Sequence, residues 1–163
     1  MFGKLKEMLE GDKGEKIHAP LKGRVIPVAE VNDPTFSGEM LGKGVAIKPE
    51  GNRIVSPVDG SVAMMFDTGH AVSLLSGGGA EVLIHVGLDT VKLRGQHFTV
   101  KARTGDAVKK GDVLIEFDLA AIAAAGYDTV TPIVITNTDD FKSVELRTGF
   151  EANELDEILT LHK

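Results

Sequence analysis

Short β-branched runs separated by glycine and proline constrain the fold of this chain more than any other feature. Such runs occupy residues 23–31, 44–49, 52–66, 70–87, 89–95, 97–102, 111–118, 131–137, 142–147 and 156–161. Turn signals recur about every 8–12 residues, a spacing that is typical of β-sandwiches and barrels. We therefore predict an all-β fold: an antiparallel β-sandwich or barrel-like domain in which each run supplies one or more strands.

Only one interior segment predicts a helix convincingly. Residues 118–127 hold an alanine-rich stretch that starts after Asp118, a residue type that caps helix starts, and ends before Gly126. We expect one or two short helices in the whole chain.

Length and composition favour a single globular domain. A chain of 163 residues with 42% hydrophobic residues can bury one sizeable core. We place the domain at residues 16–163, after a flexible N-terminal segment of residues 1–15. Residues 1–10 form a short, basic, weakly amphipathic stretch, from which we expect at most weak contact with an anionic membrane surface.

Charge and residue usage exclude several classes of function. The chain has no cysteine, so it has no disulfide, thiolate nucleophile or cysteine-ligated metal. A net charge of −6 without a basic stripe argues against nucleic acid as a partner. Neither a secretion signal nor a membrane-spanning apolar stretch is present, so we expect a cytoplasmic protein.

Two segments repeat the same spacing. Residues 104–117 and 148–161 each begin with Thr-Gly and reach an aspartate eight positions after the threonine, followed by a closing apolar run. This similarity is a weak indication that one type of hairpin has been duplicated.

Two histidines lie in one predicted hairpin. If Leu75 pairs with Ala80 across the four-residue loop 76–79, the antiparallel register places His70 directly opposite His85. Thr68, two residues before His70, would then share their face of the sheet. A slip of one residue would separate the two imidazoles, so this interpretation depends on the turn.

An imidazole in this position can serve as a ligand, a base or a nucleophile. Val82, Ile84 and Val86 alternate with His85 and form the obvious core face, so His85 lies on the less buried face. An isolated histidine is more often structural, but two histidines that converge with a threonine also indicate a chemical role. A zinc hydrolase would need a third ligand, and a serine triad would need a nucleophile elbow; the sequence shows neither pattern. Phosphoryl transfer to an imidazole needs no metal, no cysteine and no phosphate-binding loop.

Six motifs in one order resemble the glucose-class enzyme IIA domain of the bacterial phosphoenolpyruvate-dependent sugar phosphotransferase system. They are "APLKGRV", "GKGVAIKPEGNRIVSPVDGSV", "FDTGHAVSL", "LIHVGLDTVKLRGQHF", "GDAVKKGDVLIEFD" and "TPIVITN", and the similarity covers about residues 16–147. It implies a phosphocarrier that takes a phosphoryl group from phosphorylated HPr on His85 and passes it to a cysteine of a permease IIB domain. Such transfer drives sugar uptake.

The resemblance also implies roles for other residues. His70 matches the histidine that supports the phosphoryl group, and Thr68 matches the hydroxyl that orients the pair. No resident cofactor or metal is implied, although His70 and His85 can together bridge a zinc ion in a complex. The partner-docking residues that it implies are Phe36, Met40, Leu41, Phe66 and Val86, with Asp33 and Asp89 at the rim.

Other interpretations remain. Residues 56–65 and 104–117 also resemble the half-repeats of biotinyl or lipoyl carrier modules, but "AMMF" lacks the lysine that such carriers present. A regulator that binds permeases or enzymes in its unphosphorylated state is compatible with phosphoryl transfer. His18, His97 and His162 match no active position of the family, and we expect them to be surface residues.

Overall fold

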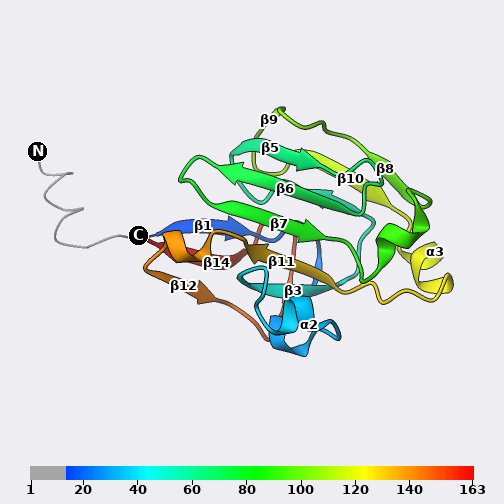
Figure 1. The fold of residues 1–163 in the computed structure, drawn as a ribbon, viewed down its shortest axis with the longest axis horizontal. Helices are drawn as coiled ribbons and strands as arrows, with labels where there is room; N and C mark the ends of the chain where they lie inside the picture. Colours follow the sequence, from blue (N-terminus) through cyan, green and yellow to red (C-terminus); the bar gives the residue numbers. More distant parts are fainter. Residues whose placement is uncertain (1–13) are drawn as a thin grey trace, which may run out of the picture.

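The computed structural model describes residues 14–163 and confirms the all-β prediction (Figure 1). The strands are β1 Glu15–His18, β2 Gly23–Pro27, β3 Lys43–Pro49, β4 Arg53–Val55, β5 Gly60–Met65, β6 Ala71–Ser76, β7 Glu81–His85, β8 Phe98–Val100, β9 Ala107–Val108, β10 Val113–Phe117, β11 Thr131–Ile135, β12 Ser143–Leu146, β13 Phe150–Ala152 and β14 Glu157–His162. The helices found within residues 14–163 are all too short to span a bilayer.

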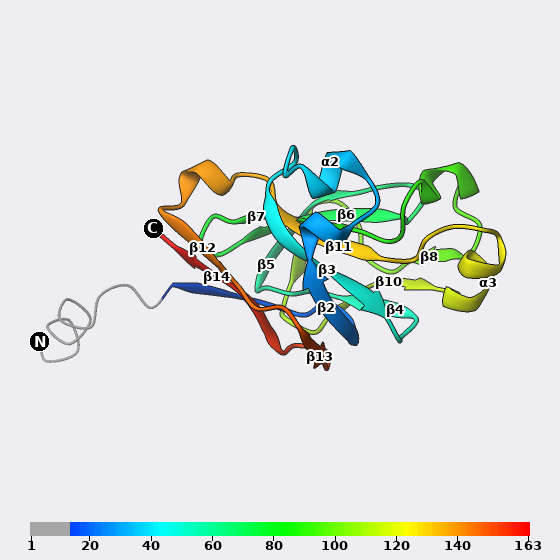
Figure 2. The ribbon, with the colours of Figure 1, turned by 90° about the horizontal axis from the view of Figure 1, so that it is seen from below.

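The strands form three antiparallel sheets. The largest has eight strands in the order β13-β2-β3-β11-β7-β6-β5-β9, and the others are β1-β14-β12 and β4-β10-β8. Figure 2 shows the short helix α2 (Pro34–Ser37) on one side of the large sheet, with β1, β14, β4 and β10 on the other. Each sheet keeps two open edges, so the fold is a sandwich and not a closed barrel.

Two apolar clusters hold these layers together. The larger lies between the sheets and includes Ile47, Ile84 and Ile133, whose side chains are fully buried. The smaller lies on the outer face of the large sheet, where Phe36 of α2 covers Val134 of β11. The α2 segment therefore covers the outer face of the sheet at β3 and β11. Because β7 lies beside β11, His85 at the end of β7 lies at the edge of the covered area.

The repeated spacing seen in the sequence corresponds to a repeated structure. The N–H of Lys109 donates to Asp112 Oδ2 and the N–H of Asn153 donates to Asp156 Oδ2, both at 2.8 Å. The carbonyl of each aspartate also accepts a backbone hydrogen bond from a residue that precedes a proline. Ser56 N–H donates to the Asp112 carbonyl, and Ala19 N–H donates to the Asp156 carbonyl. The repeat is confirmed as a turn, but the expected hairpin was wrong: β9 and β10, like β13 and β14, lie in different sheets and do not pair with each other.

The short preceding segments exchange backbone bonds reciprocally. The N–H of His18 donates to the Pro57 carbonyl at 3.1 Å, and that of Val55 donates to the Pro20 carbonyl at 2.8 Å. These bonds relate Ala19-Pro20 to Ser56-Pro57 across the centre of the fold. We did not anticipate this second repeat, because its sequence signal is limited to short stretches.

The predicted interior helix is confirmed as α3, Leu119–Ala124, with Asp118 accepting a bond from Ala121 N–H at 3.0 Å. One other prediction was wrong: the strand expected within residues 89–95 is a 3-10 helix, Thr90–Leu93. Positive φ angles at Gly87 (75°) and Asp89 (59°) turn the chain away from an extended path before it. Two further 3-10 turns cover Val28–Glu30 and Thr138–Asp140.

The domain begins one residue earlier than predicted. Glu15 is the first residue of β1, which pairs with β14, and is not part of a flexible leader. Its carboxylate accepts bonds from the Ser76 hydroxyl at 2.7 Å and from Gly78 N–H at 3.0 Å. β1 is thereby joined to the turn between β6 and β7. The amphipathic stretch predicted at residues 1–10 lies outside the described residues.

We predict that Glu15→Ala lowers the free energy of unfolding by about 1–2 kcal/mol, because a buried hydroxyl loses its acceptor and a loop loses its anchor. Urea denaturation measures the change. Glu50→Ala is the matched control at an exposed position and should stay within about 0.5 kcal/mol of the parent protein. Equal stabilities for the two variants would contradict a tethering role for Glu15.

Candidate active site

The hairpin of β6 and β7 carries the site, but its register differs by one residue from the prediction. Ser76 N–H donates to the Ala80 carbonyl, so the loop has three residues, Gly77–Gly79, and Ala71 lies opposite His85. Gly79 adopts a φ of 91°, as expected for a three-residue hairpin loop closed by a left-handed residue.

The two imidazoles meet in spite of the shifted register. His70 precedes β6, so the alternation of the strand does not govern its side chain. Its carbonyl accepts a bond from Val86 N–H at 2.7 Å, and the ring centroids of His70 and His85 lie 5.0 Å apart at 79°. The predicted pair therefore forms, for a reason other than the predicted one.

Two phenylalanines enclose the histidine pair. The Phe36 ring lies 5.3 Å from that of His85, and the Phe66 ring lies 5.3 Å from that of His70. His70 is only 6% exposed, whereas His85 is half-buried and reaches the surface. The rings of Phe36, Phe66 and His70 thus surround the one accessible imidazole, that of His85.

Hydrogen bonding determines the tautomer of His85. Its Nδ1 lies 2.6 Å from the Gly87 carbonyl oxygen, which can only accept, so Nδ1 carries the proton. Nε2 then keeps its lone pair for a reacting group. Burial lowers the pKa of His85, although the Gly87 bond and the carboxylates of Asp33 and Asp89 act in the opposite direction. The ring is consequently a neutral nucleophile near pH 7.

Thr68 fixes the second imidazole. Its hydroxyl makes a short hydrogen bond with His70 Nδ1 from the turn that precedes β6. Burial, and secondarily the nearby His85, lower the pKa of His70 to about 4. The hydroxyl can donate to Nδ1, and the proton of the neutral ring then resides on Nε2, where it is available to a third group.

A neighbouring segment supports the Thr68–His70 turn from behind. Gly69 has a φ of 72°, and a Cβ at this position would lie 3.0 Å from Phe98 Cβ and 3.2 Å from Val100 Cγ2. A Cβ on Gly95 would lie 3.8 Å from Thr68 Cα. Residues 95–100 therefore pack directly on the turn that carries Thr68, and only glycine fits at position 69.

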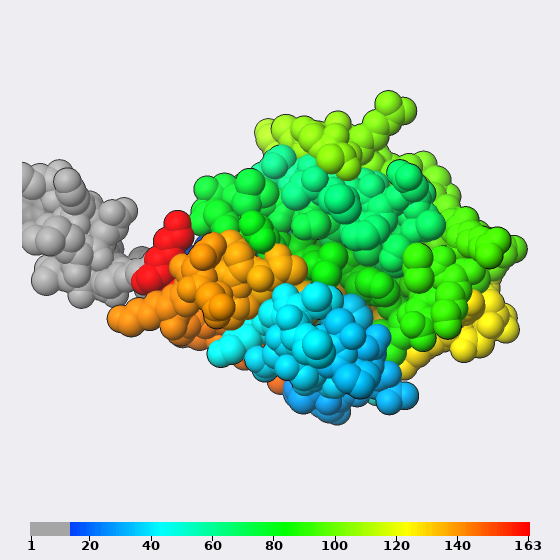
Figure 3. Space-filling model, in the orientation of Figure 1, coloured from blue at the N-terminus to red at the C-terminus, as the bar shows by residue number. Residues whose placement is uncertain are grey.

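The predicted docking residues fall into two groups. Figure 3 shows the segment around α2, in blue and cyan, on the face turned to the viewer. Next to α2, Met40 is 76% exposed and Leu41 is 37% exposed, while Asp33 and Asp89 lie near His85. Phe36 is 4% exposed and supports the His85 ring more than it offers surface. Val86 is 1% exposed within the core, so including it in a docking surface was wrong: its backbone is near the site, but its side chain points inward.

Some relevant residues were not predicted. Gly87 fixes the tautomer of His85 through its carbonyl, and no side-chain pattern can reveal such a role. Asp33 also caps α2 by accepting a bond from Thr35 N–H at 3.0 Å, a role that the sequence "DPT" could have indicated. His18, His97 and His162 are half-buried and reach the surface, as predicted.

Comparison with known proteins decides the family. Residues 15–141 match the family described as the phosphoenolpyruvate-dependent sugar phosphotransferase system, EIIA 1. The chain belongs to this family. It is thus a phosphotransferase component of that system, and the prediction of a IIA phosphocarrier is confirmed.

Relatives and a solved structure agree. The chain is 54% identical over 133 residues to the PTS system beta-glucoside-specific EIIBCA component of Dickeya chrysanthemi, covering 82% of this chain but 21% of that protein. It is 47% identical over 154 residues to the glucose-specific EIIA component of Bacillus cereus, covering 94% and 93%. The glucose permease IIA from Mycoplasma capricolum superposes with a TM-score of 0.83 at 33% identity, covering 91% and 96%.

Two lengths therefore occur among the relatives. The chain spans about a fifth of the beta-glucoside components that it matches, and nearly the whole of the glucose-specific EIIA components. The biotinyl or lipoyl alternative finds no support, since the segment that it concerned, Ala63–Phe66 at the end of β5, contains no lysine up to and including the residue that follows the strand.

The lowered pKa of His70 predicts an acid-sensitive fold. Between pH 6.5 and about 4 the unfolded chain binds a proton at this residue that the folded chain does not, so stability is lost as pH falls through this window. His70→Gln should therefore lose less stability than the parent protein between pH 7 and pH 4. Urea denaturation across this range tests the prediction, and parallel stability curves for the two proteins would contradict it.

Proposed function

We propose that His85 accepts a phosphoryl group from phosphorylated HPr and passes it to a cysteine of a permease IIB domain. The observation that carries this proposal is the bond from His85 Nδ1 to the Gly87 carbonyl, which leaves Nε2 as the free nucleophile beside a second neutral imidazole. The relatives that join IIA to IIB and IIC components support a IIB partner.

The transfer balances without a metal or another cofactor. His85 Nε2 attacks phosphorus as the P–N bond to the HPr histidine breaks, and the departing imidazole leaves with its electron pair. In the second step the IIB thiolate attacks phosphorus, and the P–Nε2 bond breaks in turn. His70 and His85 could bridge a zinc ion only with further ligands from elsewhere, so we expect a chelator to leave both rates unchanged.

His70 has a supporting role in this scheme. With Thr68 bonded to Nδ1, the His70 N–H at Nε2 can donate to a phosphoryl oxygen on His85. Because the pKa of His70 is about 4, its ring is neutral near pH 7 and can donate a hydrogen bond without adding a positive charge to the site. Phe36 and Phe66 limit access of water, which would hydrolyse the phosphoimidazole.

The surface around His85 suits a partner with basic residues. Asp33 and Asp89 border the histidine, and Met40 and Leu41 present exposed apolar area. We propose that Phe66 and these four residues contact HPr and IIB in turn, with the carboxylates steering the approach of the partner. The same surface can serve a regulated permease or enzyme when His85 is unphosphorylated. We place this exchange in the cytoplasm, where phosphoenolpyruvate is made.

His85→Ala should abolish phosphorylation. The protein is incubated with phosphoenolpyruvate, enzyme I and HPr, and acid-labile, alkali-stable phosphate on the chain is followed. His18→Ala is the matched control and should incorporate phosphate like the parent protein, because His18 bonds only to the Pro57 carbonyl away from the pair. Incorporation into His85→Ala would overturn the proposal.

His70→Ala and Thr68→Val should separate the two steps. Phosphorylation by HPr persists in both variants, but onward transfer to IIB falls by about 10²-fold or more in His70→Ala, because a donor to the transferred group is lost. Thr68→Val should fall by a smaller factor, since the imidazole remains but loses its fixed orientation. Rapid-quench measurement of phosphate on IIB gives both rates, and unchanged onward transfer would exclude the supporting role of His70.

A further inference from the structure

Thr90 carries a buried hydroxyl close to the phosphoryl-transfer site. It begins the 3-10 helix Thr90–Leu93 and is 0% exposed. Its hydroxyl donates to the Val86 carbonyl at 2.5 Å, and within residues 14–163 this is the bond that the side chain makes. A buried hydroxyl is costly unless it is bonded. The bond to Val86 is therefore what a threonine offers here and a valine of the same shape does not.

This bond fixes the first of two peptide groups that meet at Gly87. The Val86 carbonyl belongs to the peptide group that joins Val86 to Gly87. The Thr90 hydroxyl thus restrains the backbone on the side from which the chain enters Gly87.

The second peptide group, which joins Gly87 to Leu88, is bonded at both of its polar atoms. The Leu88 N–H donates to the Asp128 carbonyl at 2.9 Å, and the Gly87 carbonyl accepts from His85 Nδ1 at 2.6 Å. Because a peptide group is planar, the direction of its N–H also determines that of its carbonyl. The aim of the Gly87 carbonyl at His85 depends on restraints on both sides of the Gly87 Cα.

Gly87 needs these restraints because glycine has more torsional freedom than any other residue. Its φ is 75°, in the left-handed region, and a Cβ here would lie 2.6 Å from Thr90 Cγ2 and 2.9 Å from the Asp128 carbonyl oxygen. No side chain fits in that space. Thr90 consequently acts on Gly87 twice, through its methyl group on the Cα and through its hydroxyl on the preceding peptide group.

Thr90 is the side chain among these restraints. Asp128 contributes a backbone carbonyl, and Val86 N–H bonds to the backbone carbonyl of His70 at 2.7 Å. Backbone groups persist in every variant, whereas one substitution removes the Thr90 hydroxyl. Its contribution can therefore be measured separately.

We propose that Thr90 is a positioning residue for phosphoryl transfer. Its hydroxyl holds the Val86–Gly87 peptide group, so that the Gly87 carbonyl stays aligned with Nδ1 of His85 and the lone pair stays on Nε2. Thr90 is fully buried and acts through Gly87, without contact with the phosphoryl group. This role rests on the proposed function, in which Nε2 of His85 is the nucleophile.

Loss of the hydroxyl should mix the two neutral tautomers of His85. An imidazole with its proton on Nε2 has no lone pair at that atom, so it cannot attack phosphorus there. The rate of phosphorylation should fall with the fraction of rings in the reactive tautomer.

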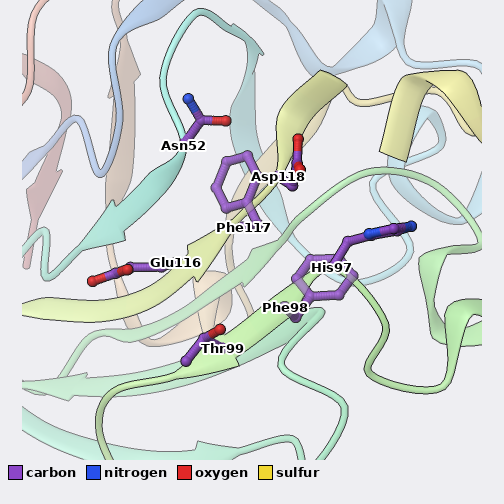
Figure 4. Close-up of a pocket in the computed structure, with 7 residues that line it drawn as sticks. All are labelled: Asn52, His97, Phe98, Thr99, Glu116, Phe117 and Asp118. Atoms are coloured by element: carbon purple, nitrogen blue, oxygen red, sulfur yellow. The ribbon is translucent and has the colours of Figure 1, made fainter. Parts of the chain in front are cut away.

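The Thr68–His70 turn has a support of a different kind. Phe98 of β8 packs behind it, where a Cβ on Gly69 would lie 3.0 Å from Phe98 Cβ. The Phe98 ring lies 6.4 Å from the ring of Phe117 at the end of β10 (Figure 4). This support is apolar packing without Thr90, so the two imidazoles of the site can be perturbed separately.

The first test is Thr90→Val, followed by imidazole nitrogen NMR of the full chain near pH 7 without HPr or phosphoenolpyruvate. The parent protein should show a protonated Nδ1 and an unprotonated Nε2 for His85. In Thr90→Val both resonances should move toward average values, while those of His70 stay in place. Thr90→Ser keeps the hydroxyl and should restore the parent spectrum. An unchanged His85 spectrum in Thr90→Val, or a serine variant that behaves like valine, would overturn the positioning role.

The second test compares the same variants by rapid-quench phosphorylation with phosphorylated HPr. Thr90→Val should lower the maximal rate about five-fold, the factor expected for one hydrogen bond, without changing the HPr concentration that gives half of that rate. Thr160→Val is the matched control. Thr160 is 7% exposed, accepts a bond from Lys16 and lies in β14 of another sheet, so its loss should leave the rate and the His85 spectrum unchanged.

Two results separate this role from the proposed function. A shifted tautomer in Thr90→Val with an unchanged rate would overturn the positioning role while His85 still accepts phosphate. If the parent chain takes up no phosphate, the proposed function fails, and the spectra alone then support or overturn the hold of Thr90 on the His85 tautomer.

Discussion

The backbone hydrogen bond from Val86 N–H to the His70 carbonyl is the constraint on which the site depends. It is the last bond between the β6 and β7 segments before the chains diverge at Gly69 and Gly87. His70 and His85 lie next to this bond, one just before its strand and the other at the end of its strand. Their rings can therefore turn toward each other, which regular pleating in this register would not allow.

Burial then gives the pair its chemistry. A charged imidazolium is poorly solvated beside Phe36 and Phe66, so both rings stay neutral, and His70 does so to about pH 4. Each ring has one nitrogen committed to a fixed partner, the Gly87 carbonyl for His85 and the Thr68 hydroxyl for His70. In the function that we propose, the opposite nitrogens meet the phosphoryl group, that of His85 as nucleophile and that of His70 as donor. Lower acid stability is the consequence of the same burial.

The two repeated turns connect short strands to segments that are distant in the chain. The side chains of Asp112 and Asp156 each accept a hydrogen bond from the backbone N–H three residues earlier, which closes the turn. Their backbone carbonyls accept a second bond from the opposing Ser-Pro or Ala-Pro segment. Within this framework, residues 95–100 pack against the Thr68–His70 turn.

The sequence alone determined the strand-rich fold, the helix after Asp118 and the identity of the two histidines, because turn residues, alternation and motif order are local signals. It predicted the wrong loop length in the triple glycine, since any of several residues can close a hairpin there. It also predicted a strand at residues 90–93, and the family resemblance implied a docking role for Val86 although strand alternation had placed this residue on the core face. Three features of the site were decided only by the tertiary structure. They are the side-chain direction at His70, the tautomer set by the Gly87 carbonyl and the burial that keeps both rings neutral. Each depends on backbone atoms and packing between segments distant in the chain, which no local pattern of side chains records.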